Sequence, residues 1–193
     1  MTTSSALFVQ DGNIFTPTLC AHGPWGADLV HGGSTGGLMA YALERCAPNE
    51  EMRMVRTTLD MFRPIPMAPL RIESEVLREG RRLQMVEATM YAEDKAVARS
   101  VGIRMKKTAI DVPDKYQPNG VVPEGPEGLQ EINAENKLSG KVLSGLNANI
   151  GIRRIDGFDG KGEGCAWFRV PVDVVDGVRN SAFTNLGLIS DFG

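Results

Sequence analysis

The hydrophobic positions of the chain change their period near residue 48. Before it, the apolar side chains step by one and three residues and form a single stripe, as in an amphipathic helix. The stripe consists of Leu38, Met39, Ala42, Leu43 and Cys46. Pro48, followed by Asn49, ends the pattern. The spacing therefore predicts a helix over residues 33–46.

After Pro48 apolar and polar residues alternate, which is typical of strands with one buried face. Four such runs lie between roughly 52 and 106, and turn residues separate them at Gly80 and at Glu93–Lys95. These runs predict an antiparallel meander. One helix followed by such a meander indicates an α+β fold in which the sheet curves around the helix.

Glycines are unusually dense at the start of the predicted helix, at positions 32, 33, 36 and 37. Gly36 and Gly37 would allow another part of the backbone to approach closely. Gly32 and Gly33 stand where unpaired N–H groups and the positive end of the helix dipole point outward. A carbonyl oxygen or an anion could bind there. For this segment, plain loop-to-helix packing and direct ligand contact both remain open.

The second half of the chain is less regular. Residues 107–145 are rich in proline and read as a surface linker. Two strands are expected in GIRRIDGF and CAWFRVPV, around a turn at Asp159–Gly160, and a helix in NSAFTNLGLISDFG. Aligning Gly37 with Gly187 places STGGLMAYA over TNLGLISDF, a short match that suggests a second copy of the same unit.

Composition excludes several classes of function. A net charge of -3 argues against a nucleic-acid-binding face. No stretch approaches the ~18 apolar residues of a membrane span, and the N-terminus lacks the basic region of a signal peptide. Three widely spaced cysteines suggest neither a zinc site nor a disulfide framework, and favour a reducing cytoplasm. With only two histidines and no GxSxG motif, catalysis would depend on carboxylates, hydroxyls or backbone donors, without a metal or cofactor.

Several short segments, in this order and spacing, resemble the double hot-dog acyl-CoA thioesterases of the thioesterase II type. These are FTPT at 15–18, GPW at 23–25, HGG at 31–33, AYALE at 40–44, RPIPMAPL, REGRR at 78–82, AWFR at 166–169 and LGLISDFG at 186–193. The resemblance implies that each half wraps a sheet around a central helix and that the halves join side by side. It implies a first domain over 1–106, a linker over 107–145 and an incomplete second domain over 146–193.

The resemblance also implies hydrolysis of fatty acyl-CoA to free acid and CoA. The aspartate that helps to activate water in this family matches Asp191, whereas its threonine and glutamine would follow Gly193. Tyr41 takes the corresponding position in the first half, which would then be a non-catalytic copy. Substrate contacts are expected from Trp25 and from His31, Gly32 and Gly33, although a core role for Trp25 is also open.

Two further residues are weighed as catalytic groups. His31 has no orienting carboxylate adjacent in sequence, which disfavours a role as general base. Glu44 lies beside Arg45 and reads as a solvated helix charge rather than as an acid.

Two other functions remain open: a non-catalytic acyl- or CoA-binding protein, and an enoyl-thioester hydratase, which ordinarily needs a histidine with a carboxylate. The last helix also needs cover for its apolar residues. This requirement predicts a homo-oligomer or a partner that completes the second domain. The residues concerned are Leu186, Leu188, Ile189 and Phe192.

Overall fold

The computed structural model describes residues 6–26, 28–116, 123–133, 145–157 and 164–192. Its main helices are α1 (Gly32–Arg45) and α3 (Ala182–Ile189), with a short α2 (Leu146–Asn149) and the 3₁₀ turns η1 (Leu19–Ala21) and η2 (Asp114–Tyr116). The strands are β1 (Phe8–Asp11), β2 (Ile14–Pro17), β3 (Met52–Met61), β4 (Leu70–Arg78), β5 (Leu83–Ala92), β6 (Lys95–Lys106), β7 (Glu131–Asn133), β8 (Gly151–Asp156) and β9 (Cys165–Arg169).

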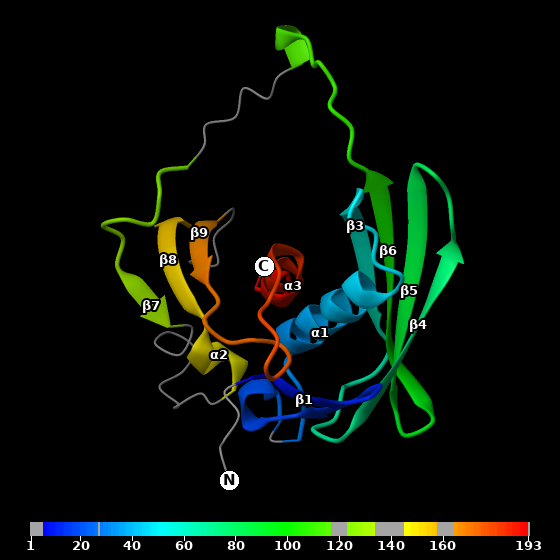
Figure 1. The fold of residues 1–193 in the computed structure, drawn as a ribbon. Coiled ribbons are helices and arrows are strands. Elements are labelled where there is room, and N and C mark those ends of the chain that lie inside the picture. The colour runs from blue at the N-terminus through cyan, green and yellow to red at the C-terminus, as the bar shows by residue number, and fades with distance from the viewer. Residues whose placement is uncertain (1–5, 27, 117–122, 134–144, 158–163, 193) are drawn as a thin grey trace.

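The helix predicted over 33–46 is confirmed as α1, shifted by one residue at each end. Its residues 33–43 are all buried, because the large sheet curves around one side of the helix and α3 covers another (Figure 1). At its C-terminal end the buried Arg104 donates hydrogen bonds to the carbonyl groups of Leu43, Glu44, Cys46 and Ala47. This guanidinium satisfies carbonyl groups that a helix end leaves without an intrahelical partner.

The large sheet is antiparallel, as predicted, with strand order β1-β2-β4-β5-β6-β3. The prediction of a simple meander is wrong for β3, which lies at the far edge beside β6 instead of beside β4. The connection after β3 contains three prolines and pairs with the loop before α1, through Val30 N to Ile65 O and Met67 N to Asp28 O, each at 2.8 Å. This pairing leads the chain across the end of the sheet before β4 begins.

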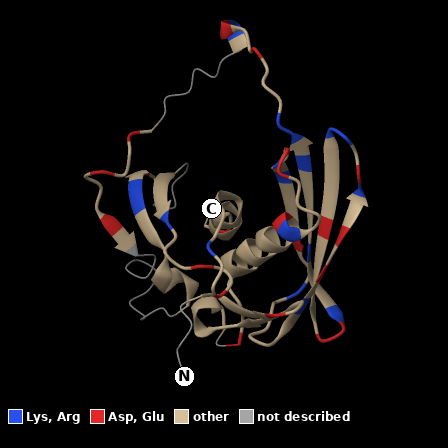
Figure 2. Ribbon diagram, in the orientation of Figure 1, with Lys and Arg blue, Asp and Glu red and all other residues tan. Residues whose placement is uncertain are grey.

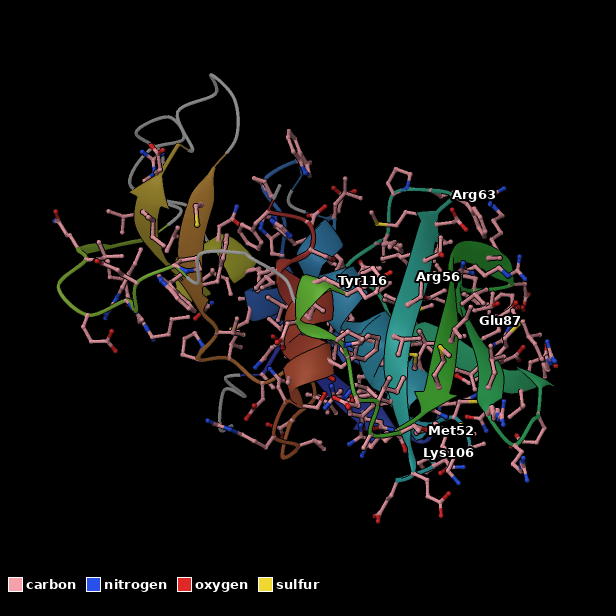
Figure 3. All side chains as sticks on the ribbon, turned by 90° about the horizontal axis from the view of Figure 1, so that it is seen from above. Met52, Arg56, Arg63, Glu87, Lys106 and Tyr116 are labelled. Atoms are coloured by element: carbon pink, nitrogen blue, oxygen red, sulfur yellow. The ribbon has the colours of Figure 1, made fainter. Side chains whose placement is uncertain are left out.

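The edge position leaves much of β3 exposed to solvent, including Val55 and Met61 at 52% and 49%. Figure 3 labels Arg56 midway along this strand and Met52 near one end. Figure 2 shows that basic and acidic residues are interspersed along the strands of the sheet, whereas the ribbon of α3 is uncharged. On the helix pair, charged residues are confined to Glu44 and Arg45 at the C-terminal end of α1.

Helices α1 and α3 run in opposite directions against one another. Gly32 lies against Asp191, just past the end of α3, while Glu44, near the end of α1, contacts Ser181 at the start of α3. A Cβ atom added to Gly36 would lie 2.3 Å from the carbonyl oxygen of Gly187. Gly36 and Gly187 therefore allow the two helix backbones to approach within a distance that no side chain would permit.

The predicted terminal helix is confirmed, although it ends at Ile189, before Asp191. The alignment of Gly37 with Gly187 shifts the numbering by 150, and the same shift takes the N-cap of α1, His31, to the N-cap of α3, Ser181. The helix repeat suggested by the sequence thus extends to the capping positions. Part of the apolar cover that α3 needs comes from α1, because Leu188 is fully buried whereas Leu186 is 58% exposed.

A second, antiparallel sheet has the order β7-β8-β9 and includes both strands predicted near Ile152 and Trp167. The turn predicted at Asp159–Gly160 lies outside the described residues. Within the stretch expected to be a linker, residues 107–116 are exposed, including those of the turn η2, and β7 pairs with β8. The domain boundaries 1–106, 107–145 and 146–193 stay predictions.

None of the helices in the described part of the chain combines the length and the apolar character that crossing a bilayer would require.

Candidate active site

The first turn of α1 is organised by His31, whose side chain is buried. His31 has extended backbone geometry, with φ -66° and ψ 141°, and its Nδ1 atom accepts a hydrogen bond of 2.9 Å from the N–H of Gly33. Its own N–H donates to the carbonyl oxygen of Ala21 at 2.9 Å. Histidine thus acts as the N-cap, a role that short polar side chains more often fill.

Asp191 meets this helix start from the opposite side. Its carboxylate lies against Gly32, where an added Cβ atom would be only 2.6 Å from Oδ2 and 2.8 Å from Oδ1. Only glycine at position 32 leaves room for the carboxylate there. The positive end of the α1 dipole stabilises a negative charge at this point. Because the Asp191 side chain is still 38% exposed, it remains accessible to water.

His31 and Asp191 are direct neighbours, with 3.3 Å between Nδ1 and Oδ2. This contact is an ion pair only when His31 is protonated. Burial lowers the pKa of His31, and the charge of Asp191 and a hydrogen bond with Asn147 offset part of that shift. The neutral imidazole is therefore the resting form, which agrees with Nδ1 acting as the hydrogen-bond acceptor for Gly33.

Aromatic rings enclose the histidine. Phe192 stacks on His31 with ring centroids 5.4 Å apart and an angle of 18° between the planes. Phe168, on β9, packs on Phe192 in turn at 5.7 Å. The second half of the chain thus supplies the carboxylate, the stacking ring and Asn147, whereas the first half supplies His31 and the helix start. Neither half forms this cluster alone.

The structure brings together four of the five residues predicted for the site: His31, Gly32, Gly33 and Asp191. Trp25 is 83% exposed and lines no part of the buried cluster. Gly33 has a clear packing role, because an added Cβ atom would lie 2.5 Å from the carbonyl oxygen of Leu188. The roles of these residues toward a ligand stay predictions.

Sequence reasoning did not assign Asn147 or Phe192 to the site and gave His31 no carboxylate partner. No carboxylate is adjacent to His31 in the sequence, and the structure supplies one from Asp191, 160 residues further along the chain. The shared 150-residue shift marks α1 and α3 as related helices, but it aligns start with start and does not place Asp191 beside His31. Asn147 lies in a stretch whose sequence contains no motif or periodicity that indicates a site.

The interpretation of Glu44 as a solvated charge is wrong. Its Oε2 atom accepts hydrogen bonds from Ser181 Oγ at 2.5 Å and from Thr184 Oγ1 at 2.9 Å. Thr184 is buried, and Ser181 is the N-cap of α3. Glu44 is therefore part of the junction between the two helices.

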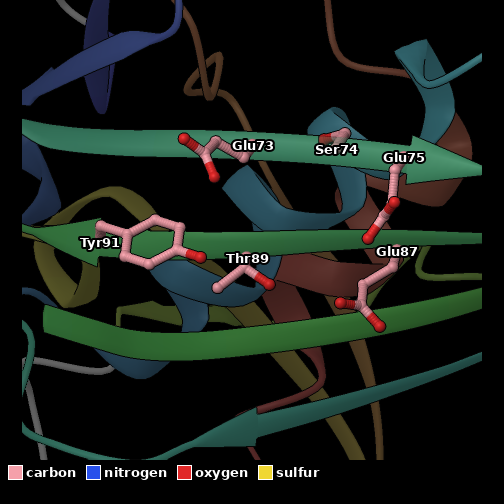
Figure 4. A pocket seen from close by; sticks show the side chains of 6 residues that line it. All are labelled: Glu73, Ser74, Glu75, Glu87, Thr89 and Tyr91. Carbon is pink, nitrogen blue, oxygen red and sulfur yellow. The ribbon is translucent and has the colours of Figure 1, made fainter. Parts of the chain in front are cut away.

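A separate hollow lies on the outer face of β4 and β5 (Figure 4). Two of its carboxylates already have partners, because Glu73 pairs with Arg71 and Glu87 pairs with Arg99. The hollow is an exposed, charge-paired sheet surface and contains none of the residues around His31. Its lining consists of Glu73, Ser74, Glu75, Glu87, Thr89 and Tyr91.

Comparison with known proteins agrees with this architecture. Residues 21–105 match the sequence model of the acyl-CoA thioesterase N-terminal domain. Over this segment, which is less than half of the chain, the resemblance seen in the sequence is confirmed. No curated protein matches the chain.

Solved structures extend the likeness in fold to nearly the whole chain. A protein of unknown function with a hot dog fold from Alicyclobacillus acidocaldarius covers 99% of this chain with a TM-score of 0.68 and 17% identity. A candidate thioesterase from Novosphingobium aromaticivorans covers 96%, with a TM-score of 0.63 and 22% identity. A tesB protein from Mycobacterium avium subspecies paratuberculosis covers 96%, with a TM-score of 0.60 and 18% identity.

The predicted α+β hot-dog fold is confirmed by these comparisons and by the sheet that curves around α1. The chain spans 68%, 71% and 64% of the length of the three solved proteins, respectively.

Proposed function

We propose that this protein hydrolyses acyl-CoA thioesters to free acid and CoA, with Asp191 as the general base. One observation carries the proposal: a partly exposed carboxylate lies against the glycine start of α1, beside backbone N–H groups. Thioester hydrolysis needs a base for water and donors for the developing oxyanion. The match of residues 21–105 to the acyl-CoA thioesterase N-terminal domain supports acyl-CoA as the substrate class.

In the proposed reaction Asp191 removes a proton from water, and the oxygen of that water attacks the thioester carbonyl carbon. N–H groups of the first turn of α1 stabilise the oxyanion, aided by the helix dipole. When the C–S bond breaks, the CoA sulfur leaves as a thiolate and takes the proton from the base. The products are the carboxylic acid and CoA with a free thiol.

The test is to incubate the protein with short-, medium- and long-chain acyl-CoAs and to follow CoA release with a thiol reagent. The wild type is expected to release CoA, and Asp191→Asn to lose about a hundredfold or more of kcat/KM while it still binds acyl-CoA. Binding without release by the wild type would instead indicate the non-catalytic acyl- or CoA-binding protein.

The contact between His31 and Asp191 also favours a second candidate, the hydration of an enoyl thioester. That chemistry uses a histidine with a carboxylate, and the structure places such a pair 3.3 Å apart. Loss of the enoyl-thioester absorbance without release of a free thiol would identify hydratase activity. Release of the thiol without hydration would exclude it.

We further propose that the chain associates, either with itself or with a partner, through the exposed edge of β3 and the exposed Leu186. Unpaired strand edges recruit further strands, and exposed apolar side chains favour cover. Light scattering measures the mass in solution, and a well-folded monomer would contradict the proposal.

We also propose a cytoplasmic location, which the free cysteines fit.

A further inference from the structure

The Nδ1 atom of His31 has two neighbours that require opposite protonation states of this atom. The N–H of Gly33 lies 2.9 Å away and needs an acceptor, whereas Asp191 Oδ2 lies 3.3 Å away and needs a donor. A single ring nitrogen carries either a lone pair or a proton, so it satisfies only one of them at a time. The proton on Nδ1 therefore decides whether the Gly33 N–H is bound or free.

We propose that His31 is a positioning residue that couples proton uptake at Asp191 to release of the Gly33 N–H for the oxyanion. The inference rests on the proposed hydrolysis and goes beyond it. It assigns to the N-cap of α1 a role that neither the base nor the backbone donors have by themselves.

In the resting site the imidazole is neutral, because burial disfavours its charged form. The groups that face it are Asp191 after α3, His22 after η1, Asn147 of α2 and the ring of Phe192. Of these, only Asp191 carries a charge opposite to that of a protonated imidazole. The resting proton is on Nε2, and Nδ1 holds the Gly33 N–H.

When Asp191 takes a proton from the attacking water, the Nδ1 atom of His31 lies 3.3 Å from Oδ2 and has a lone pair that can receive this proton. Transfer of the proton to Nδ1 restores the carboxylate and creates the His31–Asp191 ion pair. Gly33 N–H then loses its acceptor and donates to the oxyanion formed in the same step. The proton returns through Asp191 to the departing CoA sulfur, and Nδ1 recaptures Gly33.

The matched variants are His31→Asn and His31→Ala. Asparagine is a good N-cap and still accepts from Gly33, but it takes no proton at neutral pH, whereas alanine removes both functions. We expect His31→Asn to keep the melting temperature of the wild type while kcat/KM falls about tenfold or more and the acid limb of its pH profile loses the histidine ionisation. If the asparagine variant restored both stability and turnover, His31 would be only a cap and the proposal would be overturned.

NMR provides a readout that does not depend on activity. The chain has two histidines, so His31→Asn identifies the ring signals of His31 directly. We expect the ring nitrogens to report protonation on Nε2 at neutral pH, and the Gly33 amide resonance to shift as His31 titrates. In Asp191→Asn the His31 titration should move to lower pH. A Gly33 amide that ignores the titration of His31 would refute the coupling, even in an active enzyme. Absence of hydrolysis with the coupling intact would refute only the proposed function.

Discussion

The two ends of the α1–α3 pair present the same arrangement with different chemistry. At each end the N-terminus of one helix meets a carboxylate from the end of the other: Asp191, two residues past α3, lies at the start of α1, and Glu44 of α1 lies at the start of α3. Both carboxylates are placed where the helix dipole stabilises negative charge. The groups that surround them differ.

Glu44 accepts from two hydroxyl groups, Ser181 Oγ and Thr184 Oγ1, and hydroxyls do not titrate in the physiological range. Asp191 faces glycine backbone and the imidazole of His31, and 38% of its side chain is exposed. The first arrangement holds two helices together, and the second leaves a charge available to water. A carboxylate at a helix start can therefore serve either as a structural junction or as a candidate catalytic group. The groups that contact it decide which of the two it is.

The largest effect is expected from removing the charge of Asp191, and the matched change at Glu44 is its control. Asp191→Asn is expected to lower kcat/KM for acyl-CoA by about a hundredfold or more, because the proposed base is lost, with little change in stability. Glu44→Gln keeps an amide oxygen for the hydroxyl donors and should leave turnover unchanged. Thiol release measures both variants, and equal losses of turnover would contradict the division of roles.

The next largest effect is expected at the contact between Gly36 and Gly187, which allows the two helices to pack closely. In Gly36→Ala the new methyl group would start 2.3 Å from Gly187 O, so the helices must separate. We expect a loss of about 1–3 kcal/mol in the free energy of unfolding. Helix propensity alone would give a gain of about 1 kcal/mol, so the sign of the change is diagnostic. Chemical denaturation measures it, and a stabilised variant would show that the contact is not close.

A smaller effect is expected at the α3 cap. Ser181→Ala removes both the N-cap of α3 and one donor to Glu44, and should cost about 1 kcal/mol of stability. Combined with Glu44→Ala, the losses should be less than additive, because the two residues share one hydrogen bond. A double-mutant cycle by denaturation measures this coupling. Strict additivity would mean that the contact contributes nothing.

The smallest effect is on the pH dependence of stability. The folded-state pKa of His31 is lowered, chiefly by burial, so the unfolded chain binds the proton more readily. The contribution of His31 is complete above the unfolded pKa of about 6.5 and is lost as the pH falls through the lower folded value. The melting temperature of the wild type should therefore decline more steeply on acidification than that of His31→Asn. Parallel curves would show that His31 contributes no such linkage.

Some of these features could be predicted from the sequence because they are local. The 3.6-residue period of Leu38, Met39 and Ala42 depends only on the backbone geometry of a helix, and it located α1 to within one residue. The two-residue period located the long strands in the same way. Asp191 was singled out by resemblance to a family motif, and the glycines by their position at a helix start.

The sequence by itself thus determined the main helices and strands, the fold class and most of the candidate site residues. It could do so because periodicity and capping act over a few neighbouring positions. Only the tertiary structure decided that β3 lies beside β6, that Glu44 joins the two helices, and that His31 meets Asp191. Those contacts join positions far apart in the chain. They depend on how α1 and α3 pack. The local glycine pattern predicted a close approach at Gly36, but it did not identify Gly187 as the partner.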